Sequence, residues 1–309
     1  MSQPAASSRI ALIAFVVTTL VWGSTWLVIT GQLSSVPPAW SVTWRFMLAG
    51  AAMFGLAAVR GERLALDRSA WGLAGVVGFF QFFANFQLVY QAERFITSGL
   101  VAVLFALLIV PNAALGWLVN GTRVNQRFVI GSGIAIAGIA LLMLHEYRLA
   151  PAAEAGGAGY ALIGLGLTLG SVLSASIANV LQSGATARRT SIVVLLAWAM
   201  LAGTICDAVF ALATAGSPRF DLSPGYMFGM AYLALVGSVV TFPLYSILLR
   251  DWGPGRAAYN GVLVPVVAMA LSTLFEGYQW TLLAAAGAVV ALAGLLVALS
   301  GRNKAPSPS

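Results

Sequence analysis

Long apolar stretches separated by short polar connectors run through the sequence from about residue 10 to residue 300. Each stretch holds about 20 residues with few charges, the length that an α-helix needs to cross the hydrocarbon core of a bilayer. The connectors carry turn residues, for example at 34–38 and 253–255. The pattern predicts ten transmembrane helices, named here spans 1 to 10, at about residues 10–30, 39–59, 70–91, 96–118, 127–146, 158–183, 190–214, 224–249, 255–275 and 279–300.

The composition agrees with this pattern. Apolar residues make up 60% of the chain, charged residues make up 8%, and the mean hydropathy is +0.92, outside the range of soluble domains. We therefore expect an all-α integral membrane protein. One cysteine, Cys206, and one histidine, His145, supply neither a disulfide framework nor a metal site, and no cofactor is expected.

The basic residues follow membrane sidedness. The net charge of +7 would suggest nucleic acid in a soluble protein, but here 12 of the 16 Lys and Arg residues fall at one set of span ends and 3 at the other. This bias predicts a multi-pass protein of the cell inner membrane with both termini cytoplasmic. The expected partners are the lipid bilayer and a small-molecule substrate, and no nucleic acid.

The two halves of the chain resemble each other. The sequence MLAG occurs at 47–50 and again at 200–203, an offset of 153, and residues 120–138 align with 276–294 at an offset of 156, glycine on glycine. We expect two five-helix repeats, 1–150 and 151–309. Because five is odd, the second repeat begins on the opposite face and is inverted, an architecture typical of secondary transporters that work by alternating access.

Three segments resemble the drug/metabolite transporter superfamily, EamA type: LVWGSTW (20–26), WRFMLAG (44–50) and the second-repeat signature at 233–277. Within that superfamily the chain is most similar to the YddG-type aromatic amino acid exporters. The resemblance implies a ten-helix basket around a central cavity lined by spans 1, 3, 4, 6, 8 and 9, and export of small metabolites. The sequence departs from the family pattern at Asn120, where the first repeat of family members usually has a Glu, as the second repeat has here at Glu276.

Span 3 carries the sequence GFFQFFANFQLVYQ at 78–91, aromatic and rich in amides but without charge. On an ideal α-helix five of its aromatic residues fall within an arc of about 100°, with Gln87 and Gln91 beside them and Gln81 and Asn85 nearly behind: Phe79, Phe82, Phe83, Phe86 and Tyr90. Packing against lipid or other helices is the alternative, but several amides are unfavourable against lipid, and polar groups among aromatics are typical of a small-molecule site. We therefore predict that span 3 lines the substrate cavity.

Further uncharged polar and aromatic residues occur in spans 1, 6, 8 and 9. Together with span 3 they give the predicted substrate-binding set: Trp22, Ser24, Trp26, Phe79, Phe83, Asn85, Phe86, Gln87, Tyr90, Asn179, Tyr245, Tyr259 and Asn260. Pro111 and Pro265 interrupt spans 4 and 9 and are candidate hinges, with simple tolerated kinks as the alternative.

Two charged residues, Arg45 and Asp207, lie deep within predicted spans, away from the span ends. For Arg45 we expect structural pairing rather than substrate binding, and Asp207 could pair with Arg45 or carry a proton. With lone His145, Cys206 and Asp207, no catalytic triad can be assembled, which disfavours an intramembrane enzyme. The sequence favours a secondary transporter exporting aromatic or neutral amino acids. The alternatives are a drug or other metabolite exporter of the same fold, and a channel.

Small residues recur in spans 5 and 10. Gly131, Ala135 and Gly138 have the counterparts Gly287, Ala291 and Gly294. Such stripes let helices approach closely in membranes. We expect spans 5 and 10 to pack through them, and a homodimer through the same spans is left open.

Overall fold

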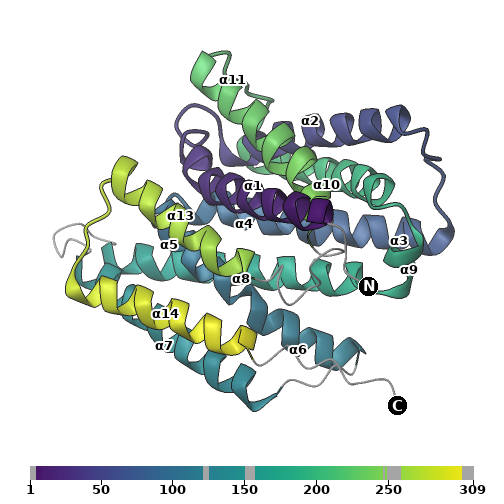
Figure 1. The fold of residues 1–309 in the computed structure, drawn as a ribbon. Helices are drawn as coiled ribbons and strands as arrows, with labels where there is room; N and C mark the ends of the chain where they lie inside the picture. The colour runs from purple at the N-terminus through teal and green to yellow at the C-terminus, as the bar shows by residue number, and fades with distance from the viewer. Residues whose placement is uncertain (1–4, 121–124, 150–156, 246–247, 249–258, 301–309) are drawn as a thin grey trace, which may run out of the picture. The chain divides into compact units, whose positions relative to one another are not determined.

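A computed structural model of the chain describes residues 5–120, 125–149, 157–245, 248 and 259–300. Regular secondary structure in these residues is entirely helical (Figure 1). The elements, in order, are α1 (Ala5–Thr30), α2 (Pro38–Val59), α3 (Arg68–Val77), η1 (Gly78–Ala84), α4 (Asn85–Ala92), α5 (Ser98–Phe105), η2 (Ala106–Leu108), α6 (Ile109–Asn120), α7 (Gln126–Leu149), α8 (Gly157–Gln182), α9 (Ala185–Arg189), α10 (Ile192–Ala215), α11 (Pro224–Ala231), η3 (Tyr232–Val240), α13 (Asn260–Phe275) and α14 (Leu282–Ser300).

The predicted spans coincide with these helices. Nine helical stretches of the described chain are long and apolar enough to cross a membrane, and each matches one expected span to within a few residues. Span 9 corresponds to the shorter apolar helix α13, and the first residues predicted for it lie outside the described part. The all-α membrane fold expected from the hydrophobic pattern is confirmed.

The chain forms two compact units, and each draws on both halves of the sequence. Unit 1 comprises Met1–Trp26, Phe95–Gly166 and Leu244–Ser309, and unit 2 comprises Leu27–Arg94 and Leu167–Pro243. Within unit 1, α7 packs on α14 and α5 packs on α13; within unit 2, α2 packs on α10. Each pair joins helices that are counterparts in the expected repeat. The repeat boundaries themselves, 1–150 and 151–309, stay a prediction.

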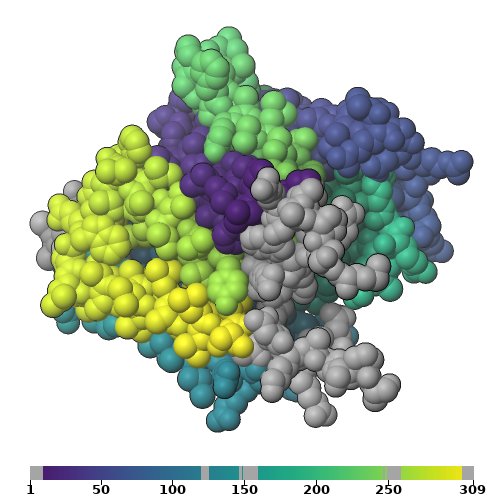
Figure 2. All heavy atoms as spheres, viewed as in Figure 1, coloured from purple at the N-terminus to yellow at the C-terminus, as the bar shows by residue number. Residues whose placement is uncertain are grey.

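In unit 1, the atoms of α14 (yellow) lie directly against those of α7 (teal) (Figure 2). The two helices approach so closely that side chains larger than their small residues cannot fit between them. A Cβ at Gly138 would collide with the backbone of Ala291, and one at Gly294 with the backbone of Ala135. The predicted small-residue packing of spans 5 and 10 is thereby confirmed. A homodimer through these helices stays a prediction, and it would use their outer faces, where Ile130 is exposed.

In unit 2, α10 lies along α2 and also along η1 (Figure 1). Glycines allow the close contact between α10 and η1. A Cβ at Gly78 would lie 2.5 Å from the Ala199 carbonyl oxygen, and one at Gly203 would lie 2.6 Å from the Phe82 Cβ. Span 3 is therefore held against span 7 at backbone distance.

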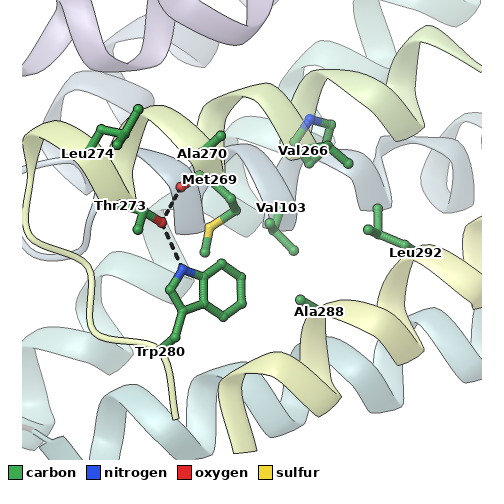
Figure 3. Close-up of a pocket in the computed structure, with 10 residues that line it drawn as sticks. Val103, Val266, Met269, Ala270, Thr273, Leu274, Trp280, Ala288 and Leu292 are labelled. Atoms are coloured by element: carbon green, nitrogen blue, oxygen red, sulfur yellow. Dashed lines mark hydrogen bonds between the residues drawn. The ribbon is translucent and has the colours of Figure 1, made fainter. Parts of the chain in front are cut away.

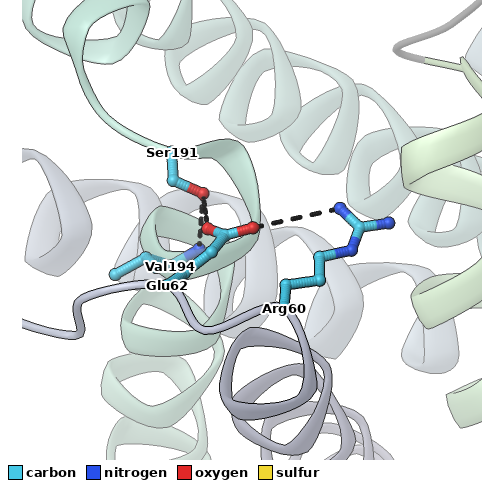
Figure 4. Close-up of polar contacts among 4 residues, drawn as sticks. All are labelled: Arg60, Glu62, Ser191 and Val194. Atoms are coloured by element: carbon cyan, nitrogen blue, oxygen red, sulfur yellow. Dashed lines mark hydrogen bonds and ion pairs between the residues drawn. The ribbon is translucent and has the colours of Figure 1, made fainter.

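The connector between α2 and α3 is fixed by polar contacts to the start of α10 (Figure 4). Ser191 caps α10 by accepting from the Val194 N–H, and its hydroxyl donates to Glu62, which also lies 4.0 Å from Arg60. At the other end of this connector, Asp67 caps α3. The Ala70 N–H and the Ser69 hydroxyl donate to its carboxylate and hold the pKa of Asp67 below its usual value.

Three membrane spans depart from regular α-helix. Span 3 contains the π-helix η1, span 8 contains the π-helix η3, and span 4 is interrupted by the 3₁₀ turn η2. Pro111 lies just after η2, as the third residue of α6. Pro265 lies inside α13, which continues past it to Phe275. Whether either proline acts as a hinge stays a prediction.

Candidate substrate-binding site

Unit 2 contains a buried polar cluster in the membrane-spanning region, formed by Arg45 of α2, Gln87 and Tyr90 of α4, and Asp207 of α10. All four side chains are at most 5% exposed. The Gln87 Nε2 donates to Asp207 Oδ1 over 2.7 Å and to the Ala39 carbonyl over 3.5 Å. The Arg45 Nη1 donates to the Tyr90 hydroxyl over 3.4 Å. We name these four residues the polar cluster.

Arg45 and Asp207 do not form the ion pair that the sequence left open. Among the described residues, no carboxylate lies within 4.0 Å of the Arg45 guanidinium. The guanidinium instead lies over two aromatic rings, 4.5 Å from the centroid of Phe86 and 5.3 Å from that of Phe46. Ring faces attract cations, so these rings stabilise the buried charge without neutralising it.

The aromatic residues of span 3 point to two neighbours instead of forming one stripe. Phe82 and Phe86 contact Phe46 of α2, at centroid distances of 5.1 and 4.7 Å. Phe83 contacts Phe210 of α10 at 5.7 Å and Phe79 at 5.2 Å. The expected stripe assumed an α-helix, whereas η1 has wider π-helical turns that rotate successive side chains by smaller steps.

The exposures of these rings differ. Phe82 is fully buried, Phe83 and Phe86 are partly buried, and Phe79 is 42% exposed. Phe82, which was not in the predicted binding set, is therefore a packing residue.

Asn85 joins span 3 to α8 within the same unit. The Ser171 hydroxyl donates to Asn85 Oδ1 over 2.6 Å, and the Asn85 amide donates to the Gln81 carbonyl over 3.2 Å. Both side-chain groups of Asn85 are thus used inside the protein. Asn179, also on α8, is partly buried.

A second polar group of unit 2 lies where α2 begins. The Ser41 hydroxyl bonds to the Tyr226 hydroxyl over 3.0 Å and to the Gln32 carbonyl over 3.2 Å, and Gln32 Nε2 donates to the Tyr226 carbonyl. Ser41 and Arg45 are one helical turn apart on α2, so this group and the polar cluster lie on the same face.

The remaining predicted site residues belong to unit 1. The rings of Trp22 and Tyr245 are 5.1 Å apart, and those of Trp26 and Phe105 are 5.2 Å apart. The Asn260 amide donates to the Thr18 hydroxyl over 2.6 Å. Two more predicted residues have local roles: the Ser24 hydroxyl bonds to the Val21 carbonyl, and Tyr259 precedes α13.

An apolar pocket of about 500 Å³ lies between α13 and α14 of unit 1, with Val103 of α5 behind them (Figure 3). The Trp280 indole at one end donates to the Thr273 hydroxyl over 2.8 Å, which saturates its N–H. Pro265 also lines it, but the predicted substrate-binding residues do not. Its wall carries no charged side chain, so it offers only apolar contact.

Glu276, singled out by its family motif, has a structural role in unit 1. Its carboxylate accepts from the Ser98 hydroxyl over 2.6 Å and from the Ser98 N–H over 3.3 Å, at the N-terminus of α5. A carboxylate there satisfies free N–H groups and the helix dipole. The side chain of its counterpart Asn120 lies outside the described part.

The sequence identified Gln87 and Tyr90 as site residues but not the residues that contact them. Asp207 is 120 positions from Gln87 in sequence, and Arg45 was expected to pair structurally. The signal that could have found them was their charge, because an ionisable residue inside a span is a functional candidate by default. Groups of three or more metal-ligating side chains are absent from the described residues.

Comparison with known proteins gives the family. The EamA-like transporter family profile matches residues 9–144 and 162–300. The chain is 26% identical over 291 residues to a "Probable amino-acid metabolite efflux pump" of Escherichia coli K12, covering 91% of this chain and 92% of that protein. It is 28% identical over 262 residues to the "Uncharacterized inner membrane transporter YedA" of the same strain, covering 84% and 80%.

A solved crystal structure has the same fold. It matches with a TM-score of 0.67 over 96% of this chain and 98% of its own, at 19% identity. The family profile covers most of both halves of the sequence, and the relatives are transporters, not enzymes. The chain therefore belongs to the EamA-like transporter family of membrane transport proteins.

Proposed function

We propose that this transporter exports amino acids that carry no net charge, with a preference for aromatic side chains, and that it works by alternating access. The observation that carries the proposal is the composition of span 3, where aromatic rings and the Gln87 amide, whose oxygen has no partner in the described chain, lie in one membrane-embedded helix. Rings offer stacking to a flat side chain, and amides and hydroxyls can bind an ammonium or a carboxylate.

Two further observations support this proposal. A relative aligned over 91% of the chain is named as an amino-acid metabolite efflux pump. The expected inverted repeat supplies two similar halves of opposite orientation, which can exchange conformations and move an opening from one face to the other. The basic residues at the span ends favour cytoplasmic termini. Transport out of the cell is proposed from the relative, which is named as an efflux pump.

The proposal is tested with purified protein reconstituted into liposomes and a panel of labelled amino acids. We expect saturable uptake of Phe, Tyr and Trp above that of protein-free liposomes, and slower uptake of Thr. A cationic aromatic drug serves as the comparison for the same-fold alternative. Uptake of the drug without uptake of any amino acid would replace the proposal with a drug exporter.

A further inference from the structure

Four polar atoms or groups of the polar cluster lack a partner in the described chain. They are Arg45 Nε, Gln87 Oε1 and Asp207 Oδ2, all shielded from solvent, and the proton of the Tyr90 hydroxyl, whose oxygen already accepts from Arg45. Leaving a buried polar group unpaired is unfavourable, and more so when the group is charged. Such a group in a transporter span calls for a ligand as its partner.

The four positions divide into two kinds. Arg45 Nε–H and the Tyr90 hydroxyl are donors beside a positive charge, whereas Asp207 Oδ2 and Gln87 Oε1 are acceptors, one of them on a carboxyl group. Gln87 and Tyr90 are three residues apart on α4 and therefore neighbours on one face of that helix, so a donor and an acceptor lie next to each other. An α-amino acid likewise carries an acceptor and a donor, its carboxylate and its ammonium, on one carbon.

From these features we infer that the polar cluster is the binding site for the zwitterionic head of the substrate. The carboxylate binds Arg45 and Tyr90, and the ammonium binds Asp207 and Gln87. Arg45 supplies a positively charged donor for the carboxylate and Asp207 a carboxyl group for the ammonium, so a ligand that lacks one end leaves part of the polar cluster without a partner. The inference rests on the proposed function and adds the two charged residues to it.

Two neighbouring features suit this role. The rings of Phe86 and Phe46 beneath the guanidinium provide an apolar wall next to the carboxylate end. The π-helix η1 directly precedes α4, and π-helical turns occur frequently at functional sites, where they interrupt the regular backbone bonds.

The test compares ligands that each lack one end of the zwitterion. The ligands are phenylalanine, phenylalaninamide, which has no carboxylate, and 3-phenylpropionate, which has no ammonium. Affinities for purified protein in detergent come from the concentration dependence of the thermal unfolding midpoint. The wild type is expected to bind phenylalanine at least about tenfold more tightly than either analogue, because each end makes charge-assisted hydrogen bonds.

Two variants test which residue binds which end of the zwitterion. Arg45→Gln should bind phenylalanine no more tightly than phenylalaninamide, whose own affinity changes by less than about threefold. Asp207→Asn should reduce the affinity for phenylalanine to that for 3-phenylpropionate, and it should leave the affinity for 3-phenylpropionate unchanged. Thr204→Val is the matched control: Thr204 is buried one turn from Asp207 on α10 and bonds only to the Met200 carbonyl, so the wild-type ratios should persist.

Each other outcome is decisive. Equal affinity of the wild type for all three ligands overturns the inference and leaves the proposed function standing, and this result needs no variant to fold. Monodisperse Arg45→Gln and Asp207→Asn variants that keep the wild-type ratios, or lose affinity for all three ligands equally, also overturn it. A wild type whose unfolding midpoint responds to no amino acid overturns the inference and the proposed function together.

Discussion

Phe82 and Phe83 are neighbours on η1, but their side chains have different environments. Phe83 is partly buried and contacts Phe79 and Phe210, whereas Phe82 is fully buried between Phe46 and the close approach of Gly203. Sequence reasoning placed these rings on one face because it assumed regular α-helical turns. The π-helix separates their roles, and nothing in the local sequence of Phe and Gln residues specifies it.

Replacing Phe83 with Ala should reduce transport of phenylalanine about five- to tenfold and that of threonine by less than about twofold. The reason is the loss of aromatic contact, worth about 0.5–1.5 kcal/mol. Uptake into liposomes is normalised to protein that elutes as a single species. Phe82→Ala is the control for packing, and it should lower the yield of folded protein because it opens a cavity, a change of about 3–5 kcal/mol. Equal losses for both substrates in Phe83→Ala would make Phe83 a packing residue as well.

At the scale of helices, α7 and α14 are the elements that the sequence predicted most fully. Their small residues recur at helical spacing in both, and the structure packs them at backbone distance. The polar cluster was beyond this kind of reasoning, because it joins α2, α4 and α10, which lie far apart in sequence. Hydrophobic length predicts each helix, but only packing determines which polar side chains meet.

Leu at Gly138 or at Gly294 should lower the thermal unfolding midpoint and the folded yield. Either side chain would have to displace the facing helix backbone, and overpacking of this kind costs about 1–3 kcal/mol or more. Gly133 on α7 provides the matched control, because a Cβ there meets no atom within 4 Å, and Gly133→Leu should fold normally. Indistinguishable yields and midpoints for all three variants would contradict the packing of α7 on α14.

For the whole molecule, the number and limits of the spans follow from the sequence because the bilayer imposes a minimum apolar length on each helix. The division into two units does not follow from it. Each unit combines segments from both halves, and α1 and α8 continue from one unit into the other. Counterpart helices of the expected repeat pack on each other in pairs, but the boundaries of the two units do not coincide with those of the repeat.

The distribution of basic residues predicts the orientation in the membrane, and labelling single cysteines in a Cys206→Ala background tests that prediction. Cysteines near Arg60 and Arg188 should react with an impermeant reagent only from the cytoplasmic side, and a cysteine at position 152 only from the outside. Labelling of position 152 from the cytoplasmic side alone would refute both the orientation and the inverted repeat.

Counterflow is the most direct test of the central claim that this protein exchanges amino acids across the membrane by alternating access. Liposomes with purified protein are loaded with unlabelled phenylalanine and diluted into a trace of labelled phenylalanine. Alternating access predicts transient accumulation of label above its equilibrium level, saturation with external phenylalanine, and a smaller effect of internal threonine. A channel gives flux that internal substrate does not stimulate, so label that only equilibrates, at a rate independent of the internal phenylalanine, would contradict the account.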